Sequence, residues 1–311
     1  MTHILTSLDG APISSFCFGT MQFGGKADEA ASRGMYDACR AAGLNFFDTA
    51  HVYTDGASET FLGRFAKDER DKVVIATKAN FPGGCSRQNI LSSLDESRQR
   101  LGMDVIDVLY LHRWDPDTPV EESIETLAKL QQDGTVRYLG VSNFAAWQVM
   151  KVQAVAQSMG TRIDILQPMY NLVKRQAEVE ILPMALSEGI AVAPYSPLGG
   201  GLLTGKYAGG DAGRLIEDER YAKRYGPAWM HQAASALAEI ASEIGVAPAT
   251  LAVAWAARHP GVTAPIISAR SVEQLEPSLA AVNFAMDDAL YDRLTALSPA
   301  PAPATDRLEE A

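Results

Sequence analysis

The hydrophobic positions of this chain gather into short runs of strand character, which alternate with longer segments of mixed polarity. The starts of the first seven runs lie about 30 residues apart, the usual length of a strand together with its returning helix. An eighth run follows after a longer gap. The pattern predicts strands at residues 16–18, 45–48, 73–77, 105–111, 136–141, 163–167, 190–195 and 263–267.

Helix signals occupy several of the intervening segments. Gly43 closes the first predicted helix, Ser86 is the expected N-cap of the second, Pro119 takes the first helical position of the third, and Pro260 follows the last. The spacing of apolar positions agrees with these boundaries. The sequence predicts both the first and the last residue for three of these helices, which cover residues 29–42, 86–100 and 248–258.

The start of the chain departs from this repeat. Residues 4–6 and 13–15 flank Leu8-Asp9-Gly10, and Asp-Gly is a signal for a hairpin turn. A hairpin does not extend a parallel ladder, so we expect it to plug one end of the main structure. Residues 208–227 are expected to form a large loop.

Eight strand-helix units allow two architectures. An open doubly wound sheet requires a switch point and often a glycine-rich first turn. A closed (β/α)₈ barrel needs eight units and about 250 residues, which this chain of 311 residues supplies. We therefore predict a single (β/α)₈ TIM barrel domain over residues 1–298, with the hairpin as its plug. The proline-containing segment 299–311 is expected to be a mobile tail.

Charge and composition narrow the functional classes. The 38 acidic residues against 27 lysines and arginines give a formal net charge of −11, which argues against nucleic-acid and membrane partners. No secretory signal and no apolar run of spanning length is visible in the sequence. The three cysteines form no paired motif, which fits a reducing cytoplasm. The sequence leaves open whether the protein is a monomer or a homo-oligomer.

Two familiar site types find little support. The stretch GGLLTGK at residues 200–206 approaches a phosphate-binding loop, but Tyr207 stands where a hydroxyl would hold Mg²⁺. The glycines and Lys206 remain suited to a phosphate group. The five histidines show no metal-binding spacing, so no metal is expected.

Four polar residues stand at or just beyond the ends of three consecutive predicted strands. They are Asp48, Tyr53, Lys78 and His112. In a barrel, the carboxyl ends of the strands share one face, which is where active sites lie. These four side chains are therefore expected to converge.

Their chemistry suits the reduction of a carbonyl group. An ammonium beside Tyr53 lowers the pKa of a phenol, and Lys78 can supply it while Asp48 orients Lys78. A neutral His112 can donate a hydrogen bond to the developing oxyanion. The protein has no hydride of its own, so this reading requires a nicotinamide cofactor.

At these residues the sequence resembles the aldo-keto reductase superfamily, and the resemblance covers nearly the whole chain. It implies an NADP-dependent enzyme with Asp48, Tyr53, Lys78 and His112 as catalytic residues. The motifs that carry it occur in family order: DTAHVY at 48–53, IATK at 75–78, LYLH at 109–112, GVSNF at 140–144 and LQPMYN at 166–171.

The resemblance also implies a cofactor site. Ser142, Asn143 and Gln167 would hold the nicotinamide carboxamide, and Tyr195 would stack on the ring. The segment after the seventh strand would line the pyrophosphate, and Arg214 would close over it. The full implied set comprises Gly19, Thr20, Met21, Asp48, Ser142, Asn143, Gln167, Tyr195, Ser196, Leu198, Gly200, Lys206, Arg214, Ser268, Arg270, Gln274 and Ser278.

Arg270 follows the last strand, where the family often has Gly-x-Arg and this chain has Ser268 in place of the glycine. The resemblance implies that Arg270 faces a 2′-phosphate, which favours NADPH/NADP+ over NADH. Pro277 and Ser278 stand where relatives commonly carry an acid and an asparagine for the adenine.

The substrate pocket is expected to use Phe23 and Trp114 beside Tyr53 and His112. Two other functions stay open. Residues 196–207 are also similar to nucleotide-binding β-subunits of channels in the same superfamily. The site would equally serve an aldose or alcohol dehydrogenase that works with NAD(P)⁺ in the oxidative direction.

Overall fold

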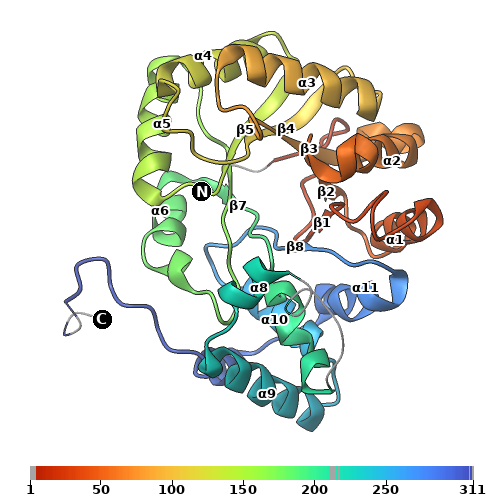
Figure 1. The fold of residues 1–311 in the computed structure, drawn as a ribbon, viewed down its shortest axis with the longest axis vertical. Coiled ribbons are helices and arrows are strands. Elements are labelled where there is room, and N and C mark those ends of the chain that lie inside the picture. Colours follow the sequence, from red (N-terminus) through yellow and green to blue (C-terminus); the bar gives the residue numbers. More distant parts are fainter. Residues whose placement is uncertain (1–4, 210–214, 216–217, 308, 310–311) are drawn as a thin grey trace.

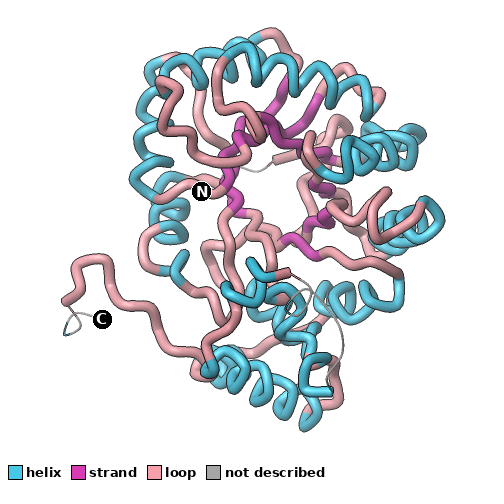
Figure 2. The backbone as a smooth tube through the Cα atoms, viewed as in Figure 1, coloured by secondary structure: helices cyan, strands magenta, loops and turns pink. Residues whose placement is uncertain are grey.

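The computed structural model describes residues 5–209, 215, 218–307 and 309. Its eight strands coincide with the eight predicted hydrophobic runs, and every pair of neighbouring strands is parallel. Figure 2 shows the strands around the centre of the molecule with the helices outside them. The strands are β1 (Cys17–Gly19), β2 (Phe46–Asp48), β3 (Val74–Ala79), β4 (Ile106–Leu111), β5 (Val136–Ser142), β6 (Ile165–Gln167), β7 (Ala191–Val192) and β8 (Ile266–Ile267).

Backbone hydrogen bonds close the sheet into a barrel. The ladder runs from β7 through β6 to β1 and ends at β8. Between β7 and β8, the N–H of Thr263 donates to the carbonyl of Val192 at 2.8 Å, and the N–H of Ile266 donates to Pro194 at 2.8 Å. A parallel bridge joins Tyr195 to Ile266. The predicted (β/α)₈ barrel is therefore confirmed.

The helices cover the outside of the barrel (Figure 1). Ser86 caps its helix as predicted, because its hydroxyl accepts from the N–H of Asn89. Pro119 is the N-cap of the next helix and not its first residue, a correction of one position. The helices are α1 (Glu29–Ala41), α2 (Ala57–Ala66), α3 (Arg87–Leu101), α4 (Val120–Gln132), α5 (Ala146–Ser158), α6 (Ile181–Glu188), α8 (Glu219–Arg224), α9 (Ala228–Glu243), α10 (Pro248–Arg258), α11 (Val272–Leu279) and α12 (Asp288–Thr295).

Helix α8 corrects the expectation of an unbroken loop over residues 208–227. The Asp218 carboxylate caps this helix by accepting the N–H of Arg220 at 2.9 Å. Glu219 occupies its first turn and Lys223 and Arg224 its last, the charge order that a helix dipole favours. Among the described helices, none alone is long and apolar enough to cross a membrane; α9 and α10 meet that test only together, as a pair bent by 103°.

The N-terminal hairpin plugs the barrel, as predicted. Thr6 and Pro12 form an antiparallel bridge around the Asp-Gly turn. Leu5 is fully buried and packs with inward-facing residues of several strands, among them Phe46, Val74 and Tyr110. Burial of such a side chain contributes roughly 1.5–3 kcal/mol, so the plug adds to the core inside the barrel.

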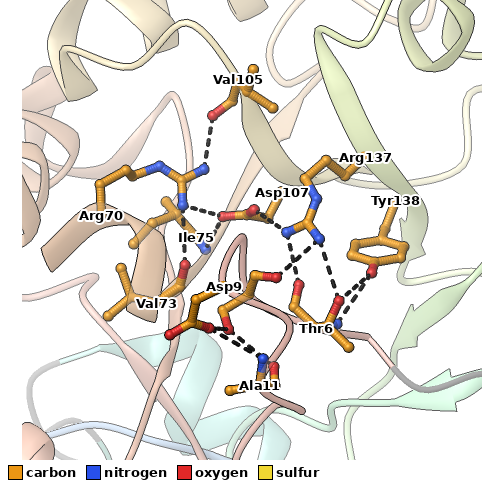
Figure 3. A network of polar contacts seen from close by, with 11 residues as sticks. Thr6, Asp9, Ala11, Arg70, Val73, Ile75, Val105, Asp107, Arg137 and Tyr138 are labelled. Atoms are coloured by element: carbon orange, nitrogen blue, oxygen red, sulfur yellow. Dashed lines mark hydrogen bonds and ion pairs between the residues drawn. The ribbon is translucent and has the colours of Figure 1, made fainter.

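A charged network fastens the hairpin to the amino ends of the strands (Figure 3). Asp107, at the start of β4, is fully buried and accepts hydrogen bonds from Arg137 at 2.7 Å and from the N–H of Ile75 at 2.8 Å. Arg70 forms an ion pair with the same carboxylate at 2.8 Å. Arg137 also donates to the carbonyl of Thr6 at 2.7 Å. This end of the barrel is thus closed, and the opposite end is left for chemistry.

After α12 the chain leaves the barrel and runs away from it (Figure 1). Leu294 of α12 is fully buried, whereas the following residues to Arg307 are mostly exposed. The boundary at residue 298 and the mobility of the tail stay predictions.

Candidate active site

A cavity of about 850 Å³ opens at the carboxyl ends of the strands, a volume within the range of small-molecule sites. It brings together most of the residues that the sequence singles out. Those that line it are Gly19, Met21, Asp48, Tyr53, His112, Ser142, Asn143, Gln167, Tyr195, Ser196, Leu198, Gly200, Lys206, Ser268, Arg270 and Gln274.

The two aromatic residues predicted for the substrate pocket, Phe23 and Trp114, are not among the residues that line this cavity. Phe23 is fully buried and packs edge-on against Phe65 in the outer core, so it does not line the cavity. Trp114 also lies outside the lining, where it packs against Phe144 and Trp147.

Two predicted cofactor residues, Thr20 and Ser278, are not among the residues that line the cavity. Thr20 is fully buried, and its hydroxyl donates to the carbonyl of Asp48 at 3.1 Å. It therefore stabilises the backbone of a site residue. Ser278 is buried, and its hydroxyl has no hydrogen-bond partner among the described residues. Arg214 lies outside the described residues.

Lys78 and Asp48 form a buried ion pair beneath the cavity. The ammonium of Lys78 donates to the Asp48 carboxylate and to the carbonyl of Thr49, the latter at 2.6 Å. Gln167 donates to the other oxygen of Asp48 at 2.8 Å. Burial disfavours the Lys78 ammonium, but the facing Asp48 and Tyr53 outweigh that effect and raise the pKa of Lys78. Lys78 is thus held charged.

Tyr53 lies directly above this pair. Its ring centroid is 5.0 Å from the Lys78 ammonium. Burial raises the pKa of the Tyr53 phenol above its ordinary value, and the Lys78 charge opposes that rise. The net direction differs from the expected lowering, because desolvation of the phenolate exceeds the stabilisation by Lys78.

His112 completes the group. Its ring meets the Tyr53 ring edge-on, with centroids 6.1 Å apart. Burial, together with the charges of Lys78 and Arg113, lowers the pKa of His112 to about 3. The imidazole is therefore neutral at physiological pH, as the sequence analysis expects. Its Nδ1 is buried and has no partner in the described part of the chain.

A chain of hydrogen bonds links the ends of β4 to β7. Tyr195 donates to Asn143 Oδ1 at 2.7 Å, and the amide of Asn143 donates to the carbonyl of His112 at 2.9 Å. Ser142 donates to the carbonyl of Gln167 at 3.0 Å. Asn143 and Ser196 both have positive φ, at 59° and 60°, a conformation that is uncommon outside glycine and clusters at functional sites.

The cavity wall includes residues that the sequence analysis missed. Val52 and Phe81 add apolar surface near Tyr53, and Tyr221 and Arg224 come from α8. Asp218 followed by Glu219 was the available signal for a helix start in this segment, and it could have brought α8 into consideration. Across the described ranges, no cluster of three metal-ligating side chains occurs.

Comparison with known proteins identifies the family. The model of the aldo/keto reductase family matches residues 15–299. An uncharacterized oxidoreductase of Bacillus subtilis, YrpG, is 36% identical, with 97% of each chain covered. A probable voltage-gated potassium channel subunit beta of Oryza sativa is 35% identical over 88% of this chain and 89% of that protein. Norsolorinic acid reductase of Aspergillus flavus is 32% identical over 92% of this chain and 78% of its own.

The chain belongs to the aldo/keto reductase family, a class of oxidoreductases built on the (β/α)₈ barrel. This confirms the resemblance drawn from the five sequence motifs.

Proposed function

We propose that the protein is an NADPH-dependent oxidoreductase that reduces aldehydes and ketones to alcohols, with Tyr53 as the proton donor. One observation carries the proposal most directly: the Tyr53 ring lines the cavity with its centroid 5.0 Å from the Lys78 ammonium, beside a neutral His112. A proton donor and a hydrogen-bond donor thereby face the same space, which is what a carbonyl oxygen requires as it gains negative charge.

The residues of the cavity fit a dinucleotide phosphate. Gly200 and Gly201 have positive φ, so the backbone can approach a ligand closely. Lys206 and Arg270 line the same wall. The buried hydroxyl of Ser268 has no partner among the described residues and is available to a phosphate oxygen. NADPH is preferred because Arg270 supplies a guanidinium for a 2′-phosphate.

The chain's own residues would act as follows. A bound reduced nicotinamide supplies a hydride to the carbonyl carbon. His112 donates a hydrogen bond to the carbonyl oxygen and orients it. Tyr53 transfers its hydroxyl proton to that oxygen, so that the alcohol forms and a phenolate remains. Lys78 stabilises the phenolate until solvent returns the proton, and Asp48 keeps Lys78 charged and in place.

A second function is favoured by the relative in Oryza sativa, whose name describes a potassium channel subunit. A protein of that kind would bind the nucleotide and sense its redox state instead of turning it over rapidly. A third possibility is oxidation of an alcohol or aldose with NADP⁺, since the same site serves both directions. A cytoplasmic location is part of the main proposal, and it agrees with three free cysteines that are all buried.

Steady-state oxidation of NADPH with 4-nitrobenzaldehyde tests the proposal. We expect turnover on the order of 1 s⁻¹ or faster in the wild type, typical of enzymes. Tyr53→Phe should reduce kcat by about 10²-fold or more and leave the NADPH dissociation constant unchanged. Tight NADPH binding without turnover of any carbonyl would favour the sensor function, and near-wild-type kcat in Tyr53→Phe would remove Tyr53 from the mechanism.

A further inference from the structure

The cavity is positive although the chain as a whole is acidic. Among the described residues, its lining contains three cations, Lys206, Arg224 and Arg270, and one carboxylate, that of Asp48. Asp48 is already paired with Lys78. The chain carries a net charge of −11, so the charge of this concave surface is opposite in sign to that of the whole chain. The cavity will therefore attract anions.

The cofactor phosphates account for two of these cations. Lys206 follows the glycine-rich segment proposed for the pyrophosphate, and Arg270 is proposed for the 2′-phosphate. Arg224 has no part in that scheme. It belongs to α8, which contributes Tyr221 and Arg224 to the lining.

Arg224 has no acidic partner in the described parts of the chain. Its guanidinium carbon lies 5.2 Å from the ring centroid of Tyr221, one helical turn earlier. Lys174 lies nearby and is also without an acidic partner within those parts; its ammonium is 5.9 Å from the ring of Tyr225. Burial and the charge of Arg224 lower the pKa of Lys174. Two neighbouring cations repel each other, and an anion placed between them and the cavity would relieve that repulsion.

One contact and two electrostatic effects relate α8 to the rest of the site. Tyr221 packs against Gly200, where an added Cβ would lie 2.7 Å from its ring. The charge of Arg224 acts on the phenol of Tyr195, whose hydroxyl is bonded to Asn143. Tyr221 in turn acts electrostatically on Tyr53. Arg224 thus lines the same cavity as Tyr195 and Tyr53 and acts electrostatically on the first of them.

We propose that Arg224, with Lys174 behind it, binds an acidic group of the carbonyl substrate, so that the preferred substrates are aldehydes or ketones that also carry a carboxylate. This inference rests on the proposed function. The guanidinium forms charge-assisted hydrogen bonds with a carboxylate, and the apolar side chains of Met21, Val52 and Phe81 line the cavity that the intervening carbon skeleton would occupy.

The test compares 4-carboxybenzaldehyde with 4-nitrobenzaldehyde, two para-substituted aldehydes of nearly equal shape that differ in charge. In the wild type, KM should be lower for the carboxylate. Arg224→Met should raise that KM by roughly 10- to 100-fold, while KM for the nitro compound changes less than about twofold. The value of kcat should hold for both, because the contact is the same in the ground and transition states. Arg224→Lys should restore part of the loss.

Arg220→Met is the matched control, because Arg220 is on the same helix but is exposed and paired with Asp218 at 2.8 Å. It should change neither KM. Calorimetric titration of 4-carboxybenzaldehyde into the NADP⁺ complex gives a readout that does not need turnover. Equal effects of Arg224→Met on both aldehydes, in KM and in binding, would overturn the inference. A loss of NADPH affinity with unchanged selectivity would also overturn it and assign Arg224 to a cofactor phosphate.

Turnover of the two aldehydes and calorimetric binding of 4-carboxybenzaldehyde together separate this inference from the proposed function. If the wild type turns over neither aldehyde, the proposed function fails. Selective binding of the carboxylate that depends on Arg224 would then still support the anion site. Turnover of both aldehydes without any preference for the carboxylate would leave the reductase and remove the anion site.

Discussion

The ring of Tyr110 fills the space in which a side chain at position 140 would lie. A Cβ built on Gly140 would be 2.5 Å from Cδ1 of Tyr110 and 3.0 Å from Cγ2 of Ile165. Tyr110 is fully buried inside the barrel, and its ring centroid is 5.8 Å from the Lys78 ammonium. The glycine of the GVSNF motif therefore has a packing role directly beneath the candidate site.

We expect Gly140→Ala to destabilise the protein by roughly 1–3 kcal/mol, the usual cost of overpacking a core. The displaced Tyr110 ring would disturb Lys78, so kcat should fall as well. Urea denaturation and steady-state kinetics measure the two effects. In a Tyr110→Val background the added methyl group has room, and the cost should largely disappear. An equal cost in both backgrounds would show that Tyr110 is not the obstacle.

Lys78→Met should lower kcat about as strongly as Tyr53→Phe does, and Asp48→Asn should lower it less. Lys78 lies beside the proton donor, with its ammonium 5.0 Å from the Tyr53 ring centroid, whereas Asp48 acts by positioning Lys78. Loss of the ammonium should raise the pKa of Tyr53 further, since Lys78 now opposes the effect of burial. The alkaline limit of carbonyl reduction should accordingly move to higher pH, while the rising limb of alcohol oxidation moves the same way. An unchanged rate and pH profile would exclude Lys78 from the mechanism.

The neutral His112 predicts a specific dependence of stability on pH. Its pKa is about 3 in the folded protein and about 6.5 in an unfolded chain. Between these values only the unfolded state binds the proton, so stability is lost as pH falls below 6.5, by on the order of 1 kcal/mol per pH unit. His112→Gln should lose less stability than the wild type between pH 6.5 and 4.5. Parallel losses in urea denaturation at the two pH values would contradict a neutral, buried His112.

The barrel could be predicted from the sequence because each strand is a short apolar run and each return segment has helical spacing. The ends of β2, β3 and β4 follow from those runs, so Asp48, Lys78 and His112 could be assigned to one face without any structure. The hairpin plug could be predicted for a similar reason, because the Asp-Gly turn signal lies close to an apolar segment that contains Leu5.

The loops were less predictable, because their course depends on contacts that are distant in sequence. Phe23 lies in the loop after β1 and packs against Phe65 in the outer core. The net rise in the pKa of Tyr53 depends on burial, which no spacing rule supplies. Arg224 was missed because α8 has only six residues and lies in a segment rich in charges.

Arg270 should carry much of the preference for NADPH. It follows β8, lines the cavity beside Ser268 and Gln274, and has its backbone N–H bonded to Gln274 Oε1 at 3.4 Å. A 2′-phosphate bears nearly two negative charges, and a guanidinium can bind it bidentately. Removal of one charge-assisted contact costs about 1.5–3 kcal/mol, roughly 10- to 150-fold in affinity.

Arg270→Ala should therefore raise the NADPH dissociation constant steeply and leave the weaker NADH constant almost unchanged, because NADH lacks the phosphate that Arg270 would contact. Fluorescence titration of both cofactors against the wild type and the variant measures this difference. Arg270→Lys serves as the control: it keeps the charge and loses the bidentate geometry, so its NADPH affinity should fall between the other two. Equal losses for NADPH and NADH would make Arg270 a structural residue. A wild type that binds NADH more tightly would overturn the cofactor assignment.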